Sequence, residues 1–205
     1  VCSSDLTLAS RTPFDKPPAW KAMRRLPLDE RLAYIASKDG RATLLGEADG
    51  APYPIDLDEV IVFREGDARY DLDPDDSLGA HARRRGTTGA ATFLDLCLES
   101  DGRQAFSWSR FNADRNAVQT MLEDPSTLIG LADAGAHVGM IMDASQPSWV
   151  LSYWCRDRGV LSLPEAVRRM TSDPATVFGI DGRGVLRPGA FADVNVIDLP
   201  ALRLH

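Results

Sequence analysis

Short apolar runs of strand length alternate with helix-periodic segments along this chain, and that alternation restricts its fold more than any other feature. One run is Val60-Ile61-Val62-Phe63, a second spans residues 104–109, and a third spans residues 127–131. Apolar residues at helical spacing lie between them, over 90–98 and 117–122. Buried strands joined by helices are typical of a parallel sheet, so the sequence predicts an α/β fold with these three runs as neighbouring parallel strands.

The last strand-like segment has a different pattern. Ala192, Val194 and Val196 alternate with mostly polar neighbours, which is typical of a strand with one face in water. Three buried strands are too few to close a barrel. The chain is therefore expected to be the later part of a barrel, followed by a piece of a separate sheet.

Several helix ends are marked by capping residues. Ser77 is expected to begin a helix that stops at Gly86. Ser162-Leu163-Pro164-Glu165 has the form of a capping box with proline in the first turn. A short helix is expected to start at Asp173-Pro174 and to end at Gly179.

Composition excludes several classes of protein. The 205 residues are 44% hydrophobic and 26% charged, as in ordinary globular proteins. Thirty acidic residues against 23 basic ones give a net charge of −7, which disfavours a nucleic-acid partner. No apolar run approaches the roughly 18–20 residues of a membrane span. The three cysteines, Cys2, Cys97 and Cys155, lack metal-finger spacing, so we expect a cytoplasmic location, with Cys97 as a small buried apolar residue.

The first residues stand apart from the rest. Val1-Cys2-Ser3-Ser4-Asp5-Leu6 lacks the charged and apolar regions of a signal peptide. The hexapeptide resembles translated adaptor sequence, and the alternative is a disordered native terminus. We expect residues 1–10 to be a non-native or disordered leader, 11–180 to be the barrel portion, and 181–205 to belong to the separate sheet.

The polar residues after the third strand run are the main candidates for chemistry. Asp133 and His137 lie in Asp133-Ala134-Gly135-Ala136-His137, directly after that run. Parallel α/β proteins place their sites at the carboxyl ends of strands, where a carboxylate binds a metal or takes a proton from metal-bound water. The alternative is that Asp133 caps a turn and His137 bonds to a nearby carbonyl. Asn112, after the second run, is a further candidate to face the site.

Three segments in order carry a family resemblance. Gly130-Leu131-Ala132-Asp133-Ala134-Gly135-Ala136-His137 resembles a strand-eight segment of the amidohydrolase superfamily, in the D-aminoacylase (N-acyl-D-amino-acid deacylase) branch. Residues 184–198 resemble the closing "G-x-L-x-P-G-x-x-A-D" signature of that family. Residues 161–175 resemble the helix that joins these two segments. The resemblance covers most of residues 11–205.

The resemblance implies a fold, a cofactor and residue roles. It implies the C-terminal part of a (β/α)8 TIM-like barrel that carries zinc, followed by strands of a small β-sandwich domain. It assigns Asp133 as general base and metal-site residue. His137 would position or bind substrate, with metal ligation as the alternative. Asn112 is expected to have a similar positioning or substrate-binding role because of its place after the second run, and not because of the resemblance.

The departures from the family pattern concern the metal. The family carries an H-x-H motif, a bridging ligand and further histidine ligands, whereas this chain has only His81, His137 and His205 and no H-x-H. Zinc needs three or four ligands. The chain by itself is therefore not expected to build the metal centre or to be active.

Two functions of different class remain open. The first is part of a zinc-dependent hydrolase of non-peptide C–N bonds, acting on a small-molecule amide such as an N-acyl-D-amino acid, or on a cyclic amide. The second is a non-catalytic amidohydrolase-like module for ligand binding or oligomerisation.

Six further side chains each have two possible roles. An apolar acyl pocket would be lined by Met140, Met142, Trp149 and Trp154, or these side chains pack in a core. A substrate carboxylate would be bound by Arg156 and Arg158, or both face solvent. Neither a nucleic acid nor a membrane is expected as a partner.

Overall fold

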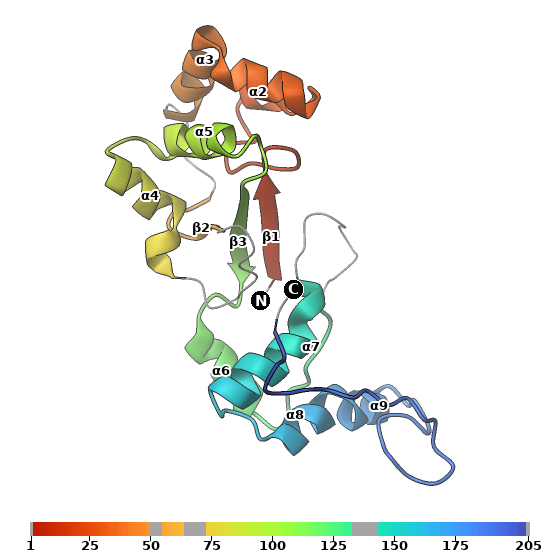
Figure 1. Cartoon of the computed structure of the whole chain (residues 1–205). Coiled ribbons are helices and arrows are strands. Elements are labelled where there is room, and N and C mark those ends of the chain that lie inside the picture. Colours follow the sequence, from red (N-terminus) through yellow and green to blue (C-terminus); the bar gives the residue numbers. More distant parts are fainter. Residues whose placement is uncertain (1, 50–54, 64–72, 133–142, 204–205) are drawn as a thin grey trace. The chain divides into compact units, whose positions relative to one another are not determined.

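The computed structural model describes residues 2–49, 55–63, 73–132 and 143–203 (Figure 1). Within these residues the chain divides into two compact units. The first, called here the sheet unit, contains the described residues up to Phe111. The second, called here the helical unit, contains residues 112–132 and 143–203. No helix in the described ranges is long and apolar enough to cross a membrane.

A three-stranded sheet in the order β1-β3-β2 organises the sheet unit. Its strands are β1 (Cys2–Thr7), β2 (Val60–Val62) and β3 (Ala105–Phe111). β1 pairs with β3 from Cys2↔Phe111 to Thr7↔Ala105, and β2 pairs with β3 from Val60↔Trp108 to Val62↔Phe106. The predicted strands at 60–63 and 104–109 are thus present.

Both pairings are antiparallel, so the predicted parallel arrangement is wrong for these strands. An apolar run specifies that a strand is buried but not the direction of its neighbour. That direction depends on how the connecting helices return the chain to the sheet. The fold class remains α/β, with a small three-stranded sheet as its β component.

The segment expected to be a disordered leader instead contains an edge strand. β1 occupies Cys2–Thr7, and Leu6 and Leu8 are 2% and 0% exposed in the core of the sheet unit. The six-residue ladder to β3 supplies backbone partners that the composition of the segment does not reveal. Its non-native origin and the ranges 11–180 and 181–205 stay predictions, since they concern the architecture of a longer protein.

Five α-helices are described in the sheet unit (Figure 1). They are α1 (Pro18–Met23), α2 (Leu28–Ala36), α3 (Lys38–Asp49), α4 (Leu78–Arg85) and α5 (Gly89–Glu99), and a 3₁₀ turn, η1 (Pro74–Asp76), precedes α4. Two of these helices confirm the sequence predictions. Ser77 accepts a hydrogen bond from the Ala80 N–H and Gly86 ends α4 at φ +64°, while α5 covers the predicted 90–98 helix.

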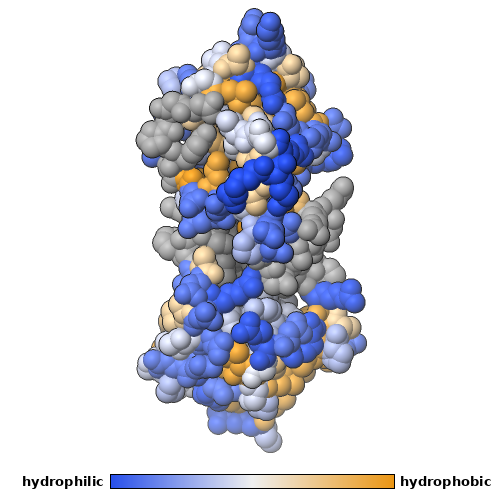
Figure 2. Space-filling view, turned by 90° about the vertical axis from the view of Figure 1, so that its left-hand side faces the viewer, coloured by the Kyte–Doolittle hydropathy of each residue, from blue (hydrophilic) through white to orange (hydrophobic). Residues whose placement is uncertain are grey.

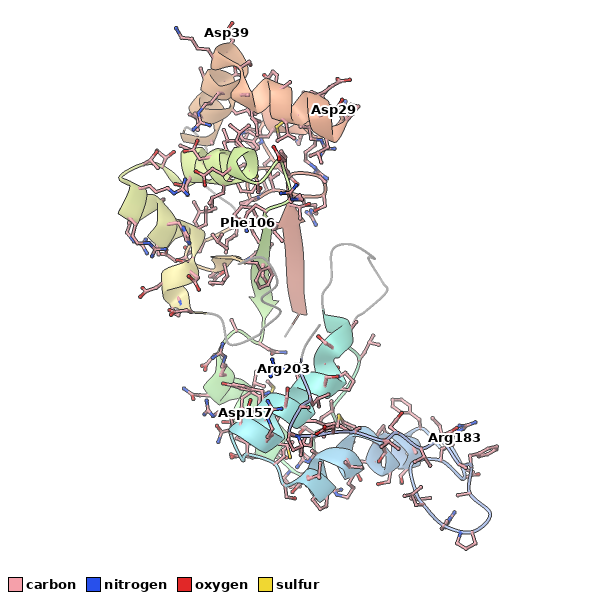
Figure 3. All side chains as sticks on the ribbon, viewed as in Figure 1. Asp29, Asp39, Phe106, Asp157, Arg183 and Arg203 are labelled. Atoms are coloured by element: carbon pink, nitrogen blue, oxygen red, sulfur yellow. The ribbon has the colours of Figure 1, made fainter. Side chains whose placement is uncertain are left out.

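The core of the sheet unit forms where α5 packs with β2, β3 and the first three helices. Phe93 of α5 is fully buried, and its ring centroid lies 4.8 Å from that of Phe106 on β3, which Figure 3 labels. The buried members of this cluster are Leu6, Leu8, Phe14, Trp20, Met23, Ile35, Leu44, Ala48, Ile55, Val60, Val62, Leu78, Ala90, Phe93, Leu94, Leu96, Cys97 and Phe106.

The helical unit contains α6 (Arg115–Glu123), a 3₁₀ turn η2 (Asp143–Ser145), α7 (Gln146–Trp149), α8 (Leu163–Met170) and α9 (Ser172–Val177). A π-helix, η3, spans Val150–Asp157. The predicted capping box is confirmed, because the Ser162 hydroxyl accepts a hydrogen bond from the Glu165 N–H. Gly179, at φ +64°, follows α9 as expected.

A smaller apolar cluster holds the helical unit together. Its buried members are Val150, Leu151, Cys155, Leu161 and Ala166. Partly buried side chains from other segments pack against it: Leu122, Ile129, Val160, Met170, Leu199 and Leu202. The π-helix, α8, the end of α6 and the C-terminal segment therefore share one core.

Two predicted strands are not strands in the structure. Residues 127–131 and 192–197 have no regular secondary structure. A strand persists only where a neighbouring strand satisfies its backbone groups, and in the described part of the chain neither segment has one. Leu131 is accordingly 87% exposed and Val196 98% exposed.

Apolar exposure is concentrated in the helical unit. Figure 2 shows orange patches between polar atoms on the visible face of this unit. Its exposed large apolar side chains are Met121, Leu128, Leu131, Leu163, Val167, Val177, Phe178, Ile180, Val185, Leu186, Phe191, Val194, Val196 and Ile197, against Leu28 in the sheet unit.

Candidate functional site

The predicted site residues are divided between described and undescribed parts of the chain. Asp133 and His137, and with them Met140 and Met142, lie outside the described residues. Asn112 is described, directly after β3, where it is exposed and adopts φ +57°. Asparagine tolerates this left-handed conformation better than most residues, so Asn112 fits the turn between β3 and α6. Its proposed contact with substrate stays a prediction.

The segment that leads to Asp133 is anchored at its start by a tight turn. The Asp124 carboxylate accepts hydrogen bonds from the Ser126 N–H at 2.8 Å and the Ser126 hydroxyl at 2.6 Å. These bonds favour the ionised form and lower the pKa of Asp124. Further along, Ile129 packs against the cluster of the helical unit. The chain is therefore fixed at two places before it reaches Asp133.

A buried arginine holds the same turn, and the sequence analysis did not identify it. Arg169 on α8 is 3% exposed, and its Nε lies 3.0 Å from an oxygen of Glu165. Its Nη1 donates to the Asp124 carbonyl at 3.3 Å. The spacing of Glu165 and Arg169, four residues apart on a helix, is the sequence signal for the ion pair. The burial of Arg169 has no such signal.

Three aromatic rings gather where the chain resumes after the undescribed segment. Trp149 stacks on Tyr153 with 5.2 Å between centroids and 8° between planes. Trp154 meets Tyr153 edge-on, with 5.0 Å between centroids. Trp149 is 6% exposed and Trp154 is 1% exposed. Both tryptophans thus have the packing role that the sequence offered as one alternative, next to each other on α7 and the π-helix.

The arginines near this aromatic cluster differ in their partners. Arg156 forms a bidentate pair with Asp157, which Figure 3 labels, and its Nη1 donates to the carbonyls of Leu199 and Leu202. The hydrogen bond from Arg156 lowers the pKa of Asp157. Arg158 instead donates from Nη1 to the Tyr153 hydroxyl oxygen at 3.2 Å. The two bonds to Leu199 and Leu202 attach the C-terminal segment to the π-helix through Arg156.

Metal-binding groups are not assembled in the described ranges. No cluster of three or more His, Cys, Asp or Glu side chains occurs there. His81 lies on α4 of the sheet unit, outside any such cluster, and His205 is outside the described residues. Cys97 is fully buried, which raises the pKa of its thiol to about 12 and disfavours the thiolate that metals bind. The prediction that Cys97 is a buried apolar residue is confirmed.

An open cavity of about 300 Å³ lies between α9 and the loop that follows it. Arg183 in its wall pairs with Asp193 and packs over the Phe191 ring, 4.4 Å from the centroid (Figure 3). The lining consists of Ser172, Ala175, Thr176, Gly179, Ile180, Asp181, Gly182, Arg183, Val185 and Arg187. Its charged groups lie at the surface, and the cavity therefore lacks the sheltered titratable pair that acid–base catalysis requires.

Comparison with known proteins places these observations in a family. A sequence model of the "Amidohydrolase family" matches residues 73–205. A dihydroorotase of Endomicrobium trichonymphae is 51% identical over 43 residues, which are 21% of this chain and 10% of the relative. An N-acyl-D-glutamate deacylase of Alcaligenes xylosoxydans xylosoxydans is 35% identical over 92 residues, 43% of this chain and 18% of the relative.

A D-aminoacylase of the same Alcaligenes is 47% identical over 49 residues, 24% of this chain and 10% of the relative. The resemblance to the D-aminoacylase branch is thereby confirmed. The chain spans about a tenth to a fifth of the length of the curated relatives it matches.

Proposed function

We propose that this chain, which belongs to the amidohydrolase family, is part of a hydrolase that cleaves a C–N bond of a small amide. The longer protein is called here the full-length protein. One observation carries the proposal: the family match runs from residue 73 to residue 205 and includes both Asp133 and the 184–198 segment. The similarity to a deacylase over 92 residues supports the same reaction class.

In the proposed reaction Asp133 moves a proton. Its carboxylate takes the proton from the water that attacks the acyl carbon and delivers it to the nitrogen of the leaving amine as the C–N bond breaks. The products are a carboxylic acid, which keeps the hydroxyl group of the water, and a free amine, which keeps the transferred proton. His137 and Asn112 have the proposed role of orienting Asp133 or the substrate.

Zinc is the proposed cofactor of the full-length protein, and Asp133 is the metal-site residue that this chain would supply. Zinc requires three or four nitrogen, oxygen or sulfur ligands. The described residues bring no such group together, and they therefore do not fit a complete zinc site. The remaining ligands are proposed to come from sequence outside this chain.

The default substrate is an N-acyl-D-amino acid, supported by similarity to an N-acyl-D-glutamate deacylase and a D-aminoacylase. A cyclic amide is the second candidate, because three of the similar proteins are dihydroorotases. Cytoplasmic location stays part of the proposal, with the buried and unpaired thiols of Cys97 and Cys155 as its support.

We also propose that the chain contributes the last part of a (β/α)8 barrel and a strand of a β-sandwich. The exposure of Val194 and Val196, at alternate positions of a strand-like pattern, supports this assignment. Both side chains would be covered once residues 192–197 pair with a strand from the rest of the full-length protein.

The experiment measures amine release by the full-length protein. N-acetyl-D-leucine, N-acetyl-D-glutamate, their L-enantiomers and dihydroorotate are the substrates to compare. Hydrolysis of at least one is expected, and the Asp133→Asn variant should lower kcat by roughly 10²–10⁴-fold, because an amide keeps the shape of the side chain but cannot take a proton.

The controls separate chemistry from folding. The melting temperature of the Asp133→Asn variant should match that of the unchanged protein, and its zinc content is measured beside kcat, because a loss of zinc would assign the lost activity to metal binding and not to proton transfer. Near-normal turnover in this variant would remove Asp133 from the mechanism, whereas loss of soluble protein would favour a turn-capping role. No hydrolysis of any substrate by the unchanged, zinc-loaded protein would favour a non-catalytic module.

A further inference from the structure

One arginine on the buried face of α8 is bonded to a distant part of the chain. Arg169 is 3% exposed, and Ala166, three residues before it on the same helix face, is fully buried. The Nη1 atom of Arg169 donates to the Asp124 carbonyl at 3.3 Å, across 45 residues of sequence. Its Nε atom donates to an oxygen of Glu165 at 3.0 Å. The guanidinium therefore joins α8 to the turn at Asp124.

The turn that Arg169 holds also has bonds of its own. The Asp124 carbonyl accepts from the backbone N–H of Thr127 at 3.3 Å and from the Thr127 hydroxyl at 3.0 Å. Two residues later, Ile129 packs against the apolar cluster that contains Ala166. The segment 124–129 is thus fixed by a polar contact to α8 and by an apolar contact to the cluster that α8 shares.

Stability alone does not explain an arginine at this buried position. A buried charge costs free energy unless it is paired and hydrogen-bonded, and replacing a buried ion pair with well-packed apolar side chains is often neutral or stabilising. A methionine at position 169 would extend the apolar face of α8 that Ala166 begins. It would have no donor for the Asp124 carbonyl, whereas a guanidinium donates in fixed directions. The arginine therefore specifies where the turn lies.

The segment that Arg169 fixes leads to the residue proposed to transfer the proton. Asp133 follows Ile129 by four residues in the sequence. A catalytic group must be held close to its reacting position, because a displacement of about 1 Å can lower the rate by about 10²-fold. We propose that Arg169 is a positioning residue that sets the placement of Asp133 through the segment 124–129. This role rests on the proposed function.

The experiment measures kcat and KM of variants of the full-length protein, well below their melting temperatures, with a substrate that the unchanged protein hydrolyses. Arg169→Met should lower kcat by roughly 10–10²-fold and leave KM nearly unchanged, because the variant displaces a reacting group and removes no contact with substrate. Its melting temperature should equal or exceed that of the unchanged protein. A folded Arg169→Met variant with normal kcat would overturn the role.

A conservative variant tests rescue. Arg169→Lys keeps the charge and a donor but not the planar fork, so it should keep more of the kcat than Arg169→Met does. Equal losses of kcat in the lysine and methionine variants would contradict a role for the bond to Asp124. Should methionine prevent folding, Arg169→Lys takes its place in the comparison that follows.

A double-variant cycle shows whether Arg169 acts through Asp133. In the Asp133→Asn background, Arg169→Met should lower kcat by no more than about twofold, since the group that it positions has already lost its function. A residue with only a structural role would lower kcat by the same factor in both backgrounds. That equal factor would overturn the proposal.

Arg168→Met is the matched control. Arg168 is the neighbouring arginine of α8, and it pairs with Asp173 and Glu165 at the surface. This variant should keep kcat within about twofold of the unchanged protein. Hydrogen exchange of the peptide 124–132 should be faster in Arg169→Met and unchanged in Arg168→Met. Equal losses of kcat in the two variants would assign the effect to α8 as a whole and contradict the proposal.

The outcomes separate this role from the proposed function. If the unchanged protein hydrolyses a substrate and Arg169→Met retains its kcat, the positioning role is wrong and the hydrolase function stands. If the unchanged, zinc-loaded protein hydrolyses nothing, the hydrolase function fails and the positioning of Asp133 fails with it. Hydrogen exchange of the peptide 124–132 then still reports whether Arg169 holds that segment.

Discussion

Burial decides the chemical character of Cys97. The side chain is fully buried in α5 among apolar neighbours, and this desolvation raises the pKa of its thiol to about 12. The neutral thiol is therefore the form that the folded state favours. The folded pKa lies above the ordinary value of 9.0 for a thiol. The contribution of Cys97 to stability is therefore complete below pH 9.0 and is lost as the pH rises toward about 12.

The prediction for Cys97 concerns its reactivity. At a pH of about 8 the native thiol should react with a disulfide reagent far more slowly than the same thiol in denaturant, since the thiolate is the nucleophile. Mass spectrometry of peptides after timed labelling measures the two rates. A native rate close to the denatured rate would show that Cys97 is not enclosed, and Cys97→Ser identifies the labelled peptide.

At the scale of single elements, the ends of helices follow from the sequence. Gly86 ends α4 at φ +64°, a conformation that side-chain-bearing residues rarely adopt, and no atom lies within 4 Å of a Cβ placed there. Gly46 lies inside α3, also with open space around such a Cβ, but its backbone is helical. These two glycines therefore differ in backbone conformation and not in available space.

Alanine at the two positions should have opposite effects on the free energy of unfolding. Gly86→Ala should lower it by about 1 kcal/mol because of the left-handed backbone. Gly46→Ala should raise it by about 0.5–1 kcal/mol because alanine favours the helix. Denaturant titration of both variants measures the difference. A loss of stability in Gly46→Ala equal to that in Gly86→Ala would contradict this explanation.

At the scale of the whole molecule, the two units have separate apolar cores. Phe93 is fully buried in the sheet unit, with Phe14, Trp20 and Phe106 as ring neighbours. Leu151 is buried in the smaller cluster of the helical unit. The two clusters share no buried residue.

Truncation of each core should therefore act on its own unit. Phe93→Ala should destabilise the sheet unit by about 3–5 kcal/mol and Leu151→Ala the helical unit by about 2–5 kcal/mol, through lost burial and the cavity left behind. Hydrogen exchange followed by mass spectrometry reports each unit by its own peptides. Equal loss of protection across both units in either variant would mean that they unfold as one.

The sequence by itself determined the features that depend on neighbouring residues. The Ser77 and Ser162 caps, the Gly86 terminus and the buried face of α5 all follow from local backbone chemistry and helical spacing. The family was likewise recognisable from contiguous segments such as 130–137, because a resemblance of this kind depends on residue types at fixed spacing along the chain.

Only the tertiary structure decided the features that depend on residues far apart. The antiparallel direction of β2 and β3, the edge strand β1, and the absence of a strand at 192–197 depend on which backbone groups meet a partner. The meeting of Arg158 with Tyr153 is local, but it depends on a π-helical turn that residue spacing does not reveal, because the same sequence read as an α-helix would place the two side chains apart. The conformational preferences of neighbouring residues determine where a helix begins and ends, whereas pairing between distant segments determines whether a segment forms a strand.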